Sequence, residues 1–249
     1  MQKYSKNKIW FLGRGFEEYI LMFDLDIANL SNCRVLDCNA GCSSFTTHMD
    51  REGFDVIATD ICYGQDPEEM EKISEKDFFT LMNAHKNLQD KVEWIFFKNH
   101  EDMVNYRIKV YHDFLEHYKK VKEEFYVESK LPKLPFLDDS FHLVLSSHLL
   151  FLYDDRLDYD FHFNSINEML RVSSEEVRIY PLVSLRSHYK SKFVGRLIND
   201  LSSEYQVKVQ KVNYHFRQGA DEMLCIQKNP KHEDKCGLLS RDIIKVEGK

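Results

Sequence analysis

Residues 34–60 read RVLDCNAGCSSFTTHMDREGFDVIATD, and this stretch decides the fold class. Val35 and Leu36 begin an apolar strand that ends at Asp37, and residues 43–52 are expected to form a helix closed by Gly53. A second strand over residues 55–59 then ends at Asp60. Parallel strands need such a helical crossover, which is right-handed in nearly all proteins. The stretch therefore predicts an α/β protein built on a parallel sheet.

The alternation of strands and helices resumes further along the chain. Strands are expected over residues 125–127, 141–145, 177–183, 206–215 and 221–227, and helices over residues 164–172 and 189–204. The last two strands are joined through residues 217–220, which predicts a hairpin. Between the second and third strands, residues 64–120 interrupt the pattern with two amphipathic helices, over residues 68–87 and 99–120. This helical insertion either packs on the sheet or forms a lid over a ligand site.

Length, charge and hydropathy exclude several classes of protein. The chain has 249 residues, of which 43% are apolar, and its formal net charge is −7, so a polyanion such as nucleic acid would be repelled. No apolar run approaches the ~20 residues of a membrane helix. The polar first residues lack the apolar core of a secretory signal, which predicts a cytoplasmic protein with its six cysteines reduced.

The turn after the first strand is the candidate binding site. Asn39 and Gly41 tolerate a positive φ, which permits a tight turn close to a ligand, and Asp60 can accept two hydrogen bonds from ribose hydroxyls. These features fit a dinucleotide or an adenosyl ligand. Asp37 favours the adenosyl ligand over the dinucleotide, because a carboxylate at the start of the turn would repel a pyrophosphate and attract the cationic groups of S-adenosylmethionine.

Two motifs carry a family resemblance. Residues 35–41, VLDCNAG, resemble motif I of the class I S-adenosylmethionine-dependent methyltransferases, and residues 134–147, LPFLDDSFHLVLSS, resemble their motif IV region. The resemblance covers residues 33–63 and 125–228. It implies a Rossmann-like, doubly wound, mainly parallel sheet of seven strands with an antiparallel last strand, here with a helical insertion.

The resemblance also assigns roles to residues. Asp37, Asn39 and Gly41 would hold the methionine portion of the cofactor, although the family usually has glycine where Asn39 stands. Asp60 would hold the ribose. Ile61 and Cys62 would lie beside the adenine. Glu128 and Ser129 would contact the amino group of the adenine. Three residues after the fourth strand would border the sulfonium and the methyl acceptor, namely Ser146, Ser147 and His148.

These motifs predict one methyltransferase domain over residues 1–230, followed by a polar tail over residues 231–249. Residues 1–32 are expected to form a helical segment that covers the cofactor, and Arg14 could bind the methionine carboxylate through its guanidinium group. Residues 64–120 form the insertion.

The expected reaction is direct in-line methyl transfer to an oxygen or nitrogen atom of a small molecule, with His148 as candidate general base. No metal site is expected, because His112 lies off the helix face that Asp113 and His117 share. The acidic run over residues 154–160 is either a solvated loop or an attraction for a cationic acceptor such as an amine. Two alternatives stay open: a module that binds S-adenosylmethionine without turnover, and an NAD-dependent oxidoreductase.

Overall fold

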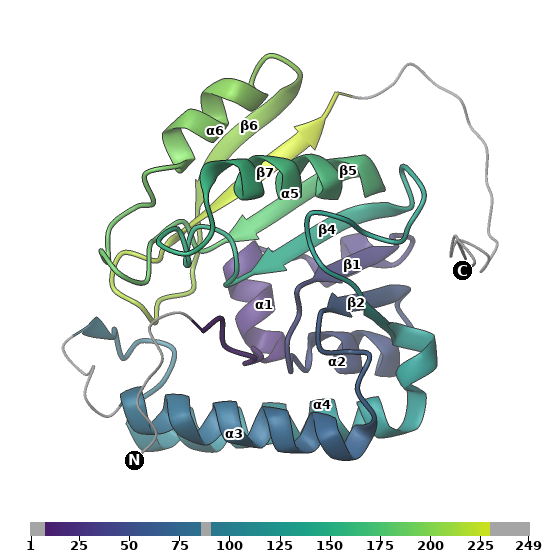
Figure 1. The fold of residues 1–249 in the computed structure, drawn as a ribbon, viewed down its shortest axis with the longest axis vertical. Helices are drawn as coiled ribbons and strands as arrows, with labels where there is room; N and C mark the ends of the chain where they lie inside the picture. Colours follow the sequence, from purple (N-terminus) through teal and green to yellow (C-terminus); the bar gives the residue numbers. More distant parts are fainter. Residues whose placement is uncertain (1–7, 86–90, 230–249) are drawn as a thin grey trace.

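The computed structural model describes residues 8–85 and 91–229. Within these residues, seven strands form one sheet in the order β3-β2-β1-β4-β5-β7-β6 (Figure 1). The strands are β1 (Val35–Cys38), β2 (Val56–Asp60), β3 (Tyr126–Glu128), β4 (Phe141–Ser147), β5 (Ser173–Tyr180), β6 (Tyr205–Lys211) and β7 (Glu222–Lys228). The first five pair in parallel, and β7 runs antiparallel to both β5 and β6. The expected Rossmann-like sheet with an antiparallel last strand is confirmed.

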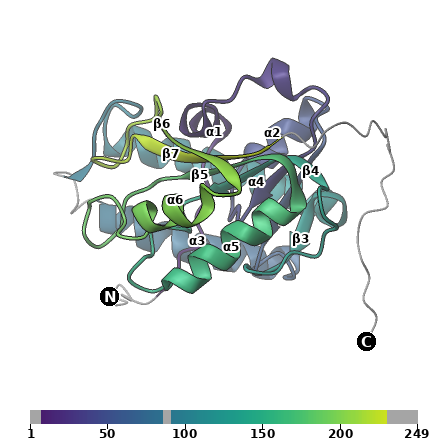
Figure 2. The same ribbon diagram turned by 90° about the horizontal axis from the view of Figure 1, so that it is seen from above.

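Helices cover both faces of this sheet. They are α1 (Phe16–Phe23), the short 3₁₀ helix η1 (Ile27–Leu30), α2 (Phe45–Arg51), α3 (Pro67–His85), α4 (His100–Phe125), α5 (Tyr159–Val172) and α6 (Val194–Leu201). Figure 2 shows α5 and α6 on one side of the sheet and α1 and α2 on the other. Because β1 lies between β2 and β4, the chain leaves β1 in one direction and later returns on the other side, which opens a crevice at the carboxyl ends of these strands.

Several boundaries differ from those expected, for local reasons. Helix α5 begins at Tyr159, five residues before the expected start, because the Asp158 carboxylate accepts the Phe161 N–H at 2.8 Å and caps the helix. Strand β5 runs from Ser173 to Tyr180 instead of over residues 177–183. Helix α6 begins at Val194 rather than at residue 189. The end of the expected helix over residues 68–87 and the expected tail over residues 231–249 lie outside the described residues.

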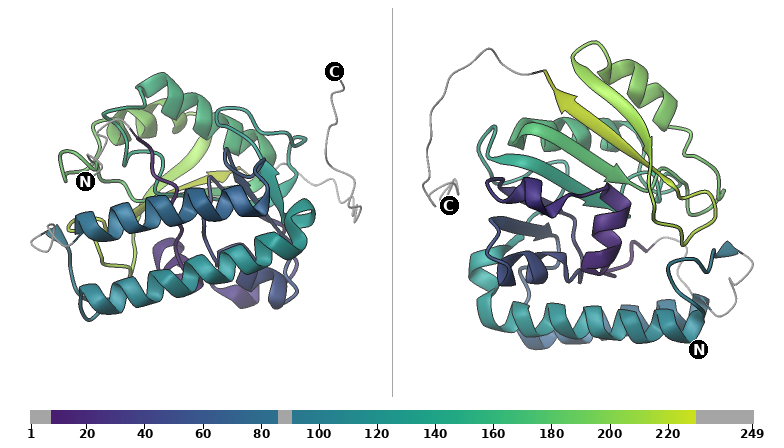
Figure 3. Two further views of the ribbon diagram at one scale, coloured as in Figure 1. Left: turned by 60° about the horizontal axis from the view of Figure 1, so that its bottom comes forward. Right: turned by 180° about the vertical axis from the view of Figure 1, so that it is seen from behind.

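The insertion between β2 and β3 forms two helices, α3 and α4, that run side by side along one edge of the molecule (Figure 3). Phe114 and Tyr118 of α4 pack in one apolar cluster with Tyr63, which follows β2, and Tyr126 of β3. The Tyr118 hydroxyl also donates to the Tyr63 carbonyl oxygen at 2.7 Å. The insertion therefore holds the chain that leaves β2, next to the crevice. Among the described residues, no helix is both long and apolar enough to span a membrane.

Candidate functional site

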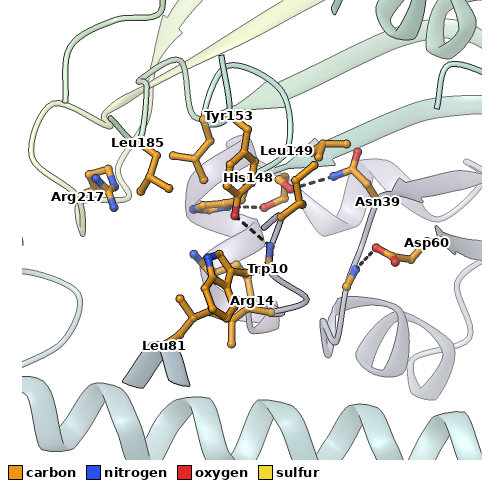
Figure 4. Close-up of a pocket in the computed structure, with 15 residues that line it drawn as sticks. Trp10, Arg14, Asn39, Asp60, Leu81, His148, Leu149, Tyr153, Leu185 and Arg217 are labelled. Carbon is orange, nitrogen blue, oxygen red and sulfur yellow. Dashed lines mark hydrogen bonds between the residues drawn. The ribbon is translucent and has the colours of Figure 1, made fainter. Parts of the chain in front are cut away.

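A cavity lies at the carboxyl ends of β1, β2 and β4 (Figure 4). Its volume is about 120 Å³, room for roughly four water molecules. The cavity is lined by six of the residues proposed from the sequence: Arg14, Asn39, Gly41, Asp60, Ser147 and His148. The other lining residues come from the N-terminal segment, α3, the chain after β4 and two later loops: Ile9, Trp10, Leu12, Leu81, Leu149, Leu152, Tyr153, Leu185 and Arg217.

The turn after β1 has the backbone conformation that the sequence predicts. Asn39 has φ 55° and Gly41 has φ 62°, both in the left-handed region. The Asn39 side-chain amide makes two hydrogen bonds. Its Nδ2 donates to the Ser147 carbonyl oxygen at 3.0 Å, and its Oδ1 accepts from the Ser146 hydroxyl at 2.8 Å. A glycine could adopt the same φ but could not make these bonds. Asn39 therefore joins the ends of β1 and β4, which explains an asparagine at this position.

Asp60 at the end of β2 faces the same turn. Its Oδ2 accepts the Gly41 N–H at 3.1 Å and its Oδ1 accepts the Cys62 N–H at 3.0 Å. Burial raises the pKa of this carboxyl, and the bonds from the Cys62 and Gly41 backbone act against that rise. The carboxylate of Asp60 therefore lies at the cavity wall, held by backbone N–H groups of the turn and of the chain after β2.

Asp37 lies behind the turn and is fully buried. Its Oδ1 accepts the Tyr19 hydroxyl at 2.9 Å, whereas its Oδ2 is buried with no hydrogen-bond partner among the described residues. Burial raises the pKa of Asp37 to about 8; the bond from Tyr19 lowers it and the negative charge of Asp60 raises it further. A buried carboxylate oxygen without a donor is costly, and a bound cation or donor would relieve that cost.

The segment before α1 lies directly on the turn. A Cβ atom added at Gly13 would come within 1.9 Å of the Cys42 carbonyl oxygen, so only glycine allows this approach. The Arg14 carbonyl oxygen accepts the Ser44 N–H at 3.2 Å, and the Ser43 hydroxyl accepts the Phe45 N–H at 3.0 Å. The N–H groups of Ser44 and Phe45, at the start of α2, thus already have partners within the chain.

Arg14 reaches the cavity from this segment. Its Nη1 donates to the Gly13 carbonyl oxygen at 3.2 Å, and its Nε, buried without a hydrogen-bond partner among the described residues, is 3.9 Å from a Glu18 carboxylate oxygen. Burial lowers the pKa of Arg14, and the nearby charge of Arg107 adds to this effect. Arg14 therefore has donor capacity to offer an anionic group.

Behind Arg14, a buried cluster ties three parts of the chain together. The Glu18 carboxylate of α1 accepts from both terminal nitrogens of Arg107 on α4 and from the hydroxyl of Tyr214, beyond β6. It also accepts the Gly15 N–H at 2.7 Å. All of these side chains are buried. The insertion is thereby bonded to the segment that covers the turn.

His148 stands just after β4, with φ 58°. Its N–H donates to the Tyr180 carbonyl oxygen at 2.8 Å, and its Nδ1 lies 2.7 Å from the Ser147 hydroxyl oxygen. Burial lowers the pKa of His148 well below 6.5, and the positive charges of Arg14, Arg107 and Arg217 lower it further. The imidazole is therefore neutral at neutral pH and able to accept a proton.

Six of the residues proposed from the sequence do not line the cavity. Asp37 and Ser146 are buried behind it. Ile61, Cys62, Glu128 and Ser129 instead lie beyond Asp60: Glu128 pairs with Asp60 in the β2–β3 register, the Ser129 N–H donates to the Asp60 carbonyl oxygen at 3.2 Å, and Ile61 is 54% exposed. All four residues are at least partly exposed.

The acidic run after β4 has structural contacts. Asp154 accepts the Ser184 hydroxyl at 2.5 Å, and Asp158 caps α5. The His162 Nε2 accepts the Phe151 N–H at 2.9 Å. No residue of 154–160 lines the cavity, so the acidic run does not supply, in the cavity wall, the attraction for a cationic acceptor that the sequence left open.

Sequence reasoning missed several cavity residues. Trp10, Tyr153, Leu185 and Arg217 come from loops and segments without a motif. The sequence contains only general indications of two of the regions involved. Trp10 belongs to the expected covering segment before β1, and Leu81 belongs to the insertion that was expected to pack or to form a lid. Nothing in the local sequence marked Arg217, because it approaches through the hairpin between β6 and β7.

The order of the strands and the antiparallel β7 give the chain the fold of the class I methyltransferases. The chain belongs to the same family as the uncharacterized protein MJ0045 of Methanocaldococcus jannaschii: the two are 35% identical over 218 residues, which span 87% of this chain and 95% of that protein. No protein-family model matches the chain.

Solved structures with a similar fold include two methyltransferases. The magnesium protoporphyrin IX methyltransferase ChlM of Synechocystis PCC 6803, with bound SAM, is 12% identical with a TM-score of 0.43, and the match covers 86% of this chain and 76% of that one. A putative S-adenosyl-L-methionine-dependent methyltransferase of Methanococcus maripaludis is 13% identical with a TM-score of 0.46, covering 88% of each chain. These likenesses concern the fold alone.

Proposed function

We propose that this chain is a methyltransferase that binds S-adenosylmethionine and transfers its methyl group directly to an oxygen or nitrogen atom of a small molecule. The observation that carries the proposal is the buried, unpartnered Oδ2 of Asp37 behind the turn after β1. A cation bound near this carboxyl would stabilise its ionised form, and S-adenosylmethionine carries an ammonium and a sulfonium group next to its nucleoside.

The remaining residues fit the other portions of this cofactor. The Asp60 carboxylate would accept from ribose hydroxyls. The residues beyond it would lie beside the adenine: Ile61, Cys62, Glu128 and Ser129. Arg14 offers its guanidinium to the methionine carboxylate. Ser146, Ser147 and His148 border the place where the acceptor would meet the sulfonium.

The site disfavours the oxidoreductase alternative. A dinucleotide would place its pyrophosphate at the start of α2, where the Ser44 and Phe45 N–H groups already have partners in the chain. It would also bring two phosphate charges near the carboxylate of Asp60, which repels them, and those charges would hold the buried Asp37 in its protonated form.

S-adenosylmethionine would supply the activated methyl group, so the protein's task is to align the acceptor and exclude water. Trp10, Leu81 and Tyr153 add apolar surface to the cavity wall. The neutral His148 would take the proton of an acceptor hydroxyl or amine, and the Ser147 hydroxyl next to Nδ1 orients its ring. An acceptor that is already deprotonated needs no such base.

Calorimetry with S-adenosylmethionine, S-adenosylhomocysteine and NAD tests the assignment. The wild type should bind the first two and not NAD. Asp60→Ala should weaken cofactor binding roughly 100-fold, because it removes charged hydrogen bonds to the ribose. Asp55→Ala, at the exposed opposite end of β2, is the matched control and should bind like the wild type.

Asp60 also accepts two backbone N–H groups, so the fold of the variant needs its own check. Asp60→Asn keeps the shape of the side chain and should still weaken binding. Unchanged affinity in a folded Asp60 variant, or binding of NAD alone, would overturn the proposal. Release of labelled product from labelled S-adenosylmethionine separates an enzyme from a module that only binds the cofactor.

A further inference from the structure

Two residues with a left-handed backbone stand at neighbouring strand ends in the cavity wall. Asn39 follows β1 with φ 55°, and His148 follows β4 with φ 58° (Figure 4). Neither is glycine, the residue that adopts this conformation without steric cost. Strands β1 and β4 pair in parallel, with Cys38 opposite Ser146, so the chain leaves the same edge of the sheet at both residues. Backbone strain of this kind gathers where side chains have a function.

One peptide unit connects the two residues. It joins Ser147 to His148, and its carbonyl oxygen accepts a hydrogen bond from the Asn39 Nδ2 at 3.0 Å. The N–H at its other end donates to the Tyr180 carbonyl oxygen at 2.8 Å. Because a peptide unit is planar, these two bonds fix the plane from which the His148 side chain departs. The Asn39 amide is itself held, since its Oδ1 accepts the Ser146 hydroxyl at 2.8 Å.

The imidazole of His148 has two further contacts. Its ring packs edge-on against the Tyr180 ring, with the centroids 5.4 Å apart and the planes at 64°. Its Nδ1 lies 2.7 Å from the Ser147 hydroxyl oxygen, whereas its Nε2 has no hydrogen-bond partner among the described residues. Since His148 lines the cavity, Nε2 is the ring nitrogen that is available to a ligand.

The Ser147 hydroxyl fits one tautomer of this ring better than the other. A hydroxyl can donate to Nδ1 or accept from an Nδ1–H. If it accepts, the lone pair of the neutral ring lies on Nε2, and the same hydrogen bond survives when Nε2 takes a proton. If it donates, Nε2 already carries the proton and cannot act as a base. The bond made by one ring nitrogen thus sets the state of the other.

We propose that Asn39 is the positioning residue for His148. Its backbone forms the turn after β1, and its side chain holds the Ser147–His148 peptide unit so that Nδ1–H stays on the Ser147 hydroxyl and Nε2 faces the cavity. This inference rests on the proposed function, in which His148 takes the proton of the methyl acceptor.

The proton and the electrons of that step balance. The acceptor O–H or N–H bond breaks and its proton passes to Nε2 of His148. A lone pair of the same oxygen or nitrogen forms the bond to the methyl carbon, and the electron pair of the broken carbon–sulfur bond stays on sulfur. The ring then returns its proton to solvent.

Nitrogen-15 NMR of the histidine rings tests the position of the proton in the protein without ligand. The wild type should show His148 with a protonated Nδ1 and an unprotonated Nε2, and His148→Gln identifies these signals by their loss. Asn39→Gly keeps the left-handed φ but removes both side-chain bonds, so the two nitrogens should give averaged signals of a ring in more than one state.

A second variant and a control separate this effect from a general loss of structure. Asn39→Asp keeps the shape of the side chain but places an oxygen where Nδ2 donates, so it should disturb the ring in the same way. Asn167→Ala removes a bond of the same kind, from Nδ2 to the Phe163 carbonyl oxygen at 2.9 Å, away from the cavity. It should leave the His148 signals unchanged.

Transfer kinetics separate positioning from cofactor binding. With labelled S-adenosylmethionine and a small-molecule cell extract as the source of acceptor, Asn39→Gly should lower the apparent kcat roughly 10- to 100-fold, because the base is misplaced. The KM for S-adenosylmethionine, and its Kd by calorimetry, should change less than about 3-fold, because glycine keeps the conformation of the turn. Asn167→Ala should match the wild type in all three quantities.

Several results would overturn the inference and leave the proposed function standing. They are a wild-type His148 with its proton on Nε2, ring signals unchanged in both Asn39 variants, an unchanged kcat in Asn39→Gly, or a loss confined to the KM and Kd for S-adenosylmethionine. No labelled product with the wild type would overturn the proposed function and with it the role of Asn39 in transfer. The spectra of the ligand-free protein decide the orientation of the ring in either case.

Discussion

The buried carboxyl of Asp37 makes the stability of this protein depend on pH in a specific way. With its pKa raised from 3.8 to about 8, the folded state holds a proton that the unfolded state releases above pH 4. The stability from this group is therefore complete below pH 3.8 and is lost as the pH rises towards and through 8. Between pH 6 and pH 9 the loss amounts to about 3 kcal/mol, given 1.36 kcal/mol per unit.

Asp37→Asn removes this ionisation and keeps the shape of the side chain. The asparagine Oδ1 can still accept the Tyr19 hydroxyl, so the main contact survives. Urea denaturation at pH 6 and pH 9 should show the wild type losing about 3 kcal/mol more than the variant over this interval. Asp55→Asn, at an exposed carboxylate of the same βαβ unit, is the control for the chemical change.

The same carboxyl should respond to the cofactor. A cation beside Oδ2 favours the ionised form, so binding of S-adenosylmethionine at pH 7 should release about one proton. Calorimetry in two buffers of different ionisation enthalpy measures that proton, and Asp37→Asn should abolish it while weakening binding. Parallel pH dependence in the wild type and the variant, or binding without proton release, would refute the assignment of a buried, protonated Asp37.

Two further predictions follow from the cover and the candidate base. Gly13→Ala should destabilise the protein by about 1–3 kcal/mol and weaken cofactor binding, because the new Cβ would collide with the Cys42 backbone. Gly195→Ala in α6, where a Cβ meets nothing within 4 Å, should be neutral or slightly stabilising, and equal stability of the two variants would contradict the close approach. Once a methyl acceptor has been identified, His148→Gln should lower kcat by roughly 100-fold or more. The wild-type rate should not fall as the pH drops from 8 to 6.5, because the pKa of His148 lies well below 6.5. An unchanged kcat would remove His148 from proton transfer.

The sheet was predictable because its signals are local. The run from Arg34 to Asp60 contains two apolar strands, a helix and the turn between them, so the hydrophobic pattern alone predicts the crossover. The left-handed conformations of Asn39 and Gly41 follow from their residue types. The boundaries of β5 and α6 were less predictable, since they depend on bonds such as Ser191 N–H to the Leu182 carbonyl oxygen that join residues of an irregular loop.

The part of the cavity wall formed by segments far apart in the sequence could not be predicted in the same way, because its residues meet only in the folded chain. Leu81 lies in the insertion, Trp10 precedes the sheet, and Arg217 sits in the last hairpin. Their convergence depends on the buried cluster in which Glu18 of α1 binds Arg107 of the insertion and Tyr214. Burying an ion pair costs desolvation free energy, and removing one partner of a buried pair costs more. The pair therefore stabilises one arrangement of these segments over others.

The buried cluster also gives the insertion a physical role. Arg107 donates to the Gly13 carbonyl oxygen at 3.3 Å as well as to Glu18, and Asp77 of α3 accepts the Phe11 N–H at 3.1 Å. Both insertion helices therefore bond to the segment that covers the turn, on either side of Leu12. Because this cavity is smaller than the ~300–1,000 Å³ typical of small-molecule sites, a cofactor and an acceptor together require some movement of the cover. Any such movement must break or carry along the contacts of Arg107 and Asp77, so we expect the insertion to couple opening of the cavity to its own position.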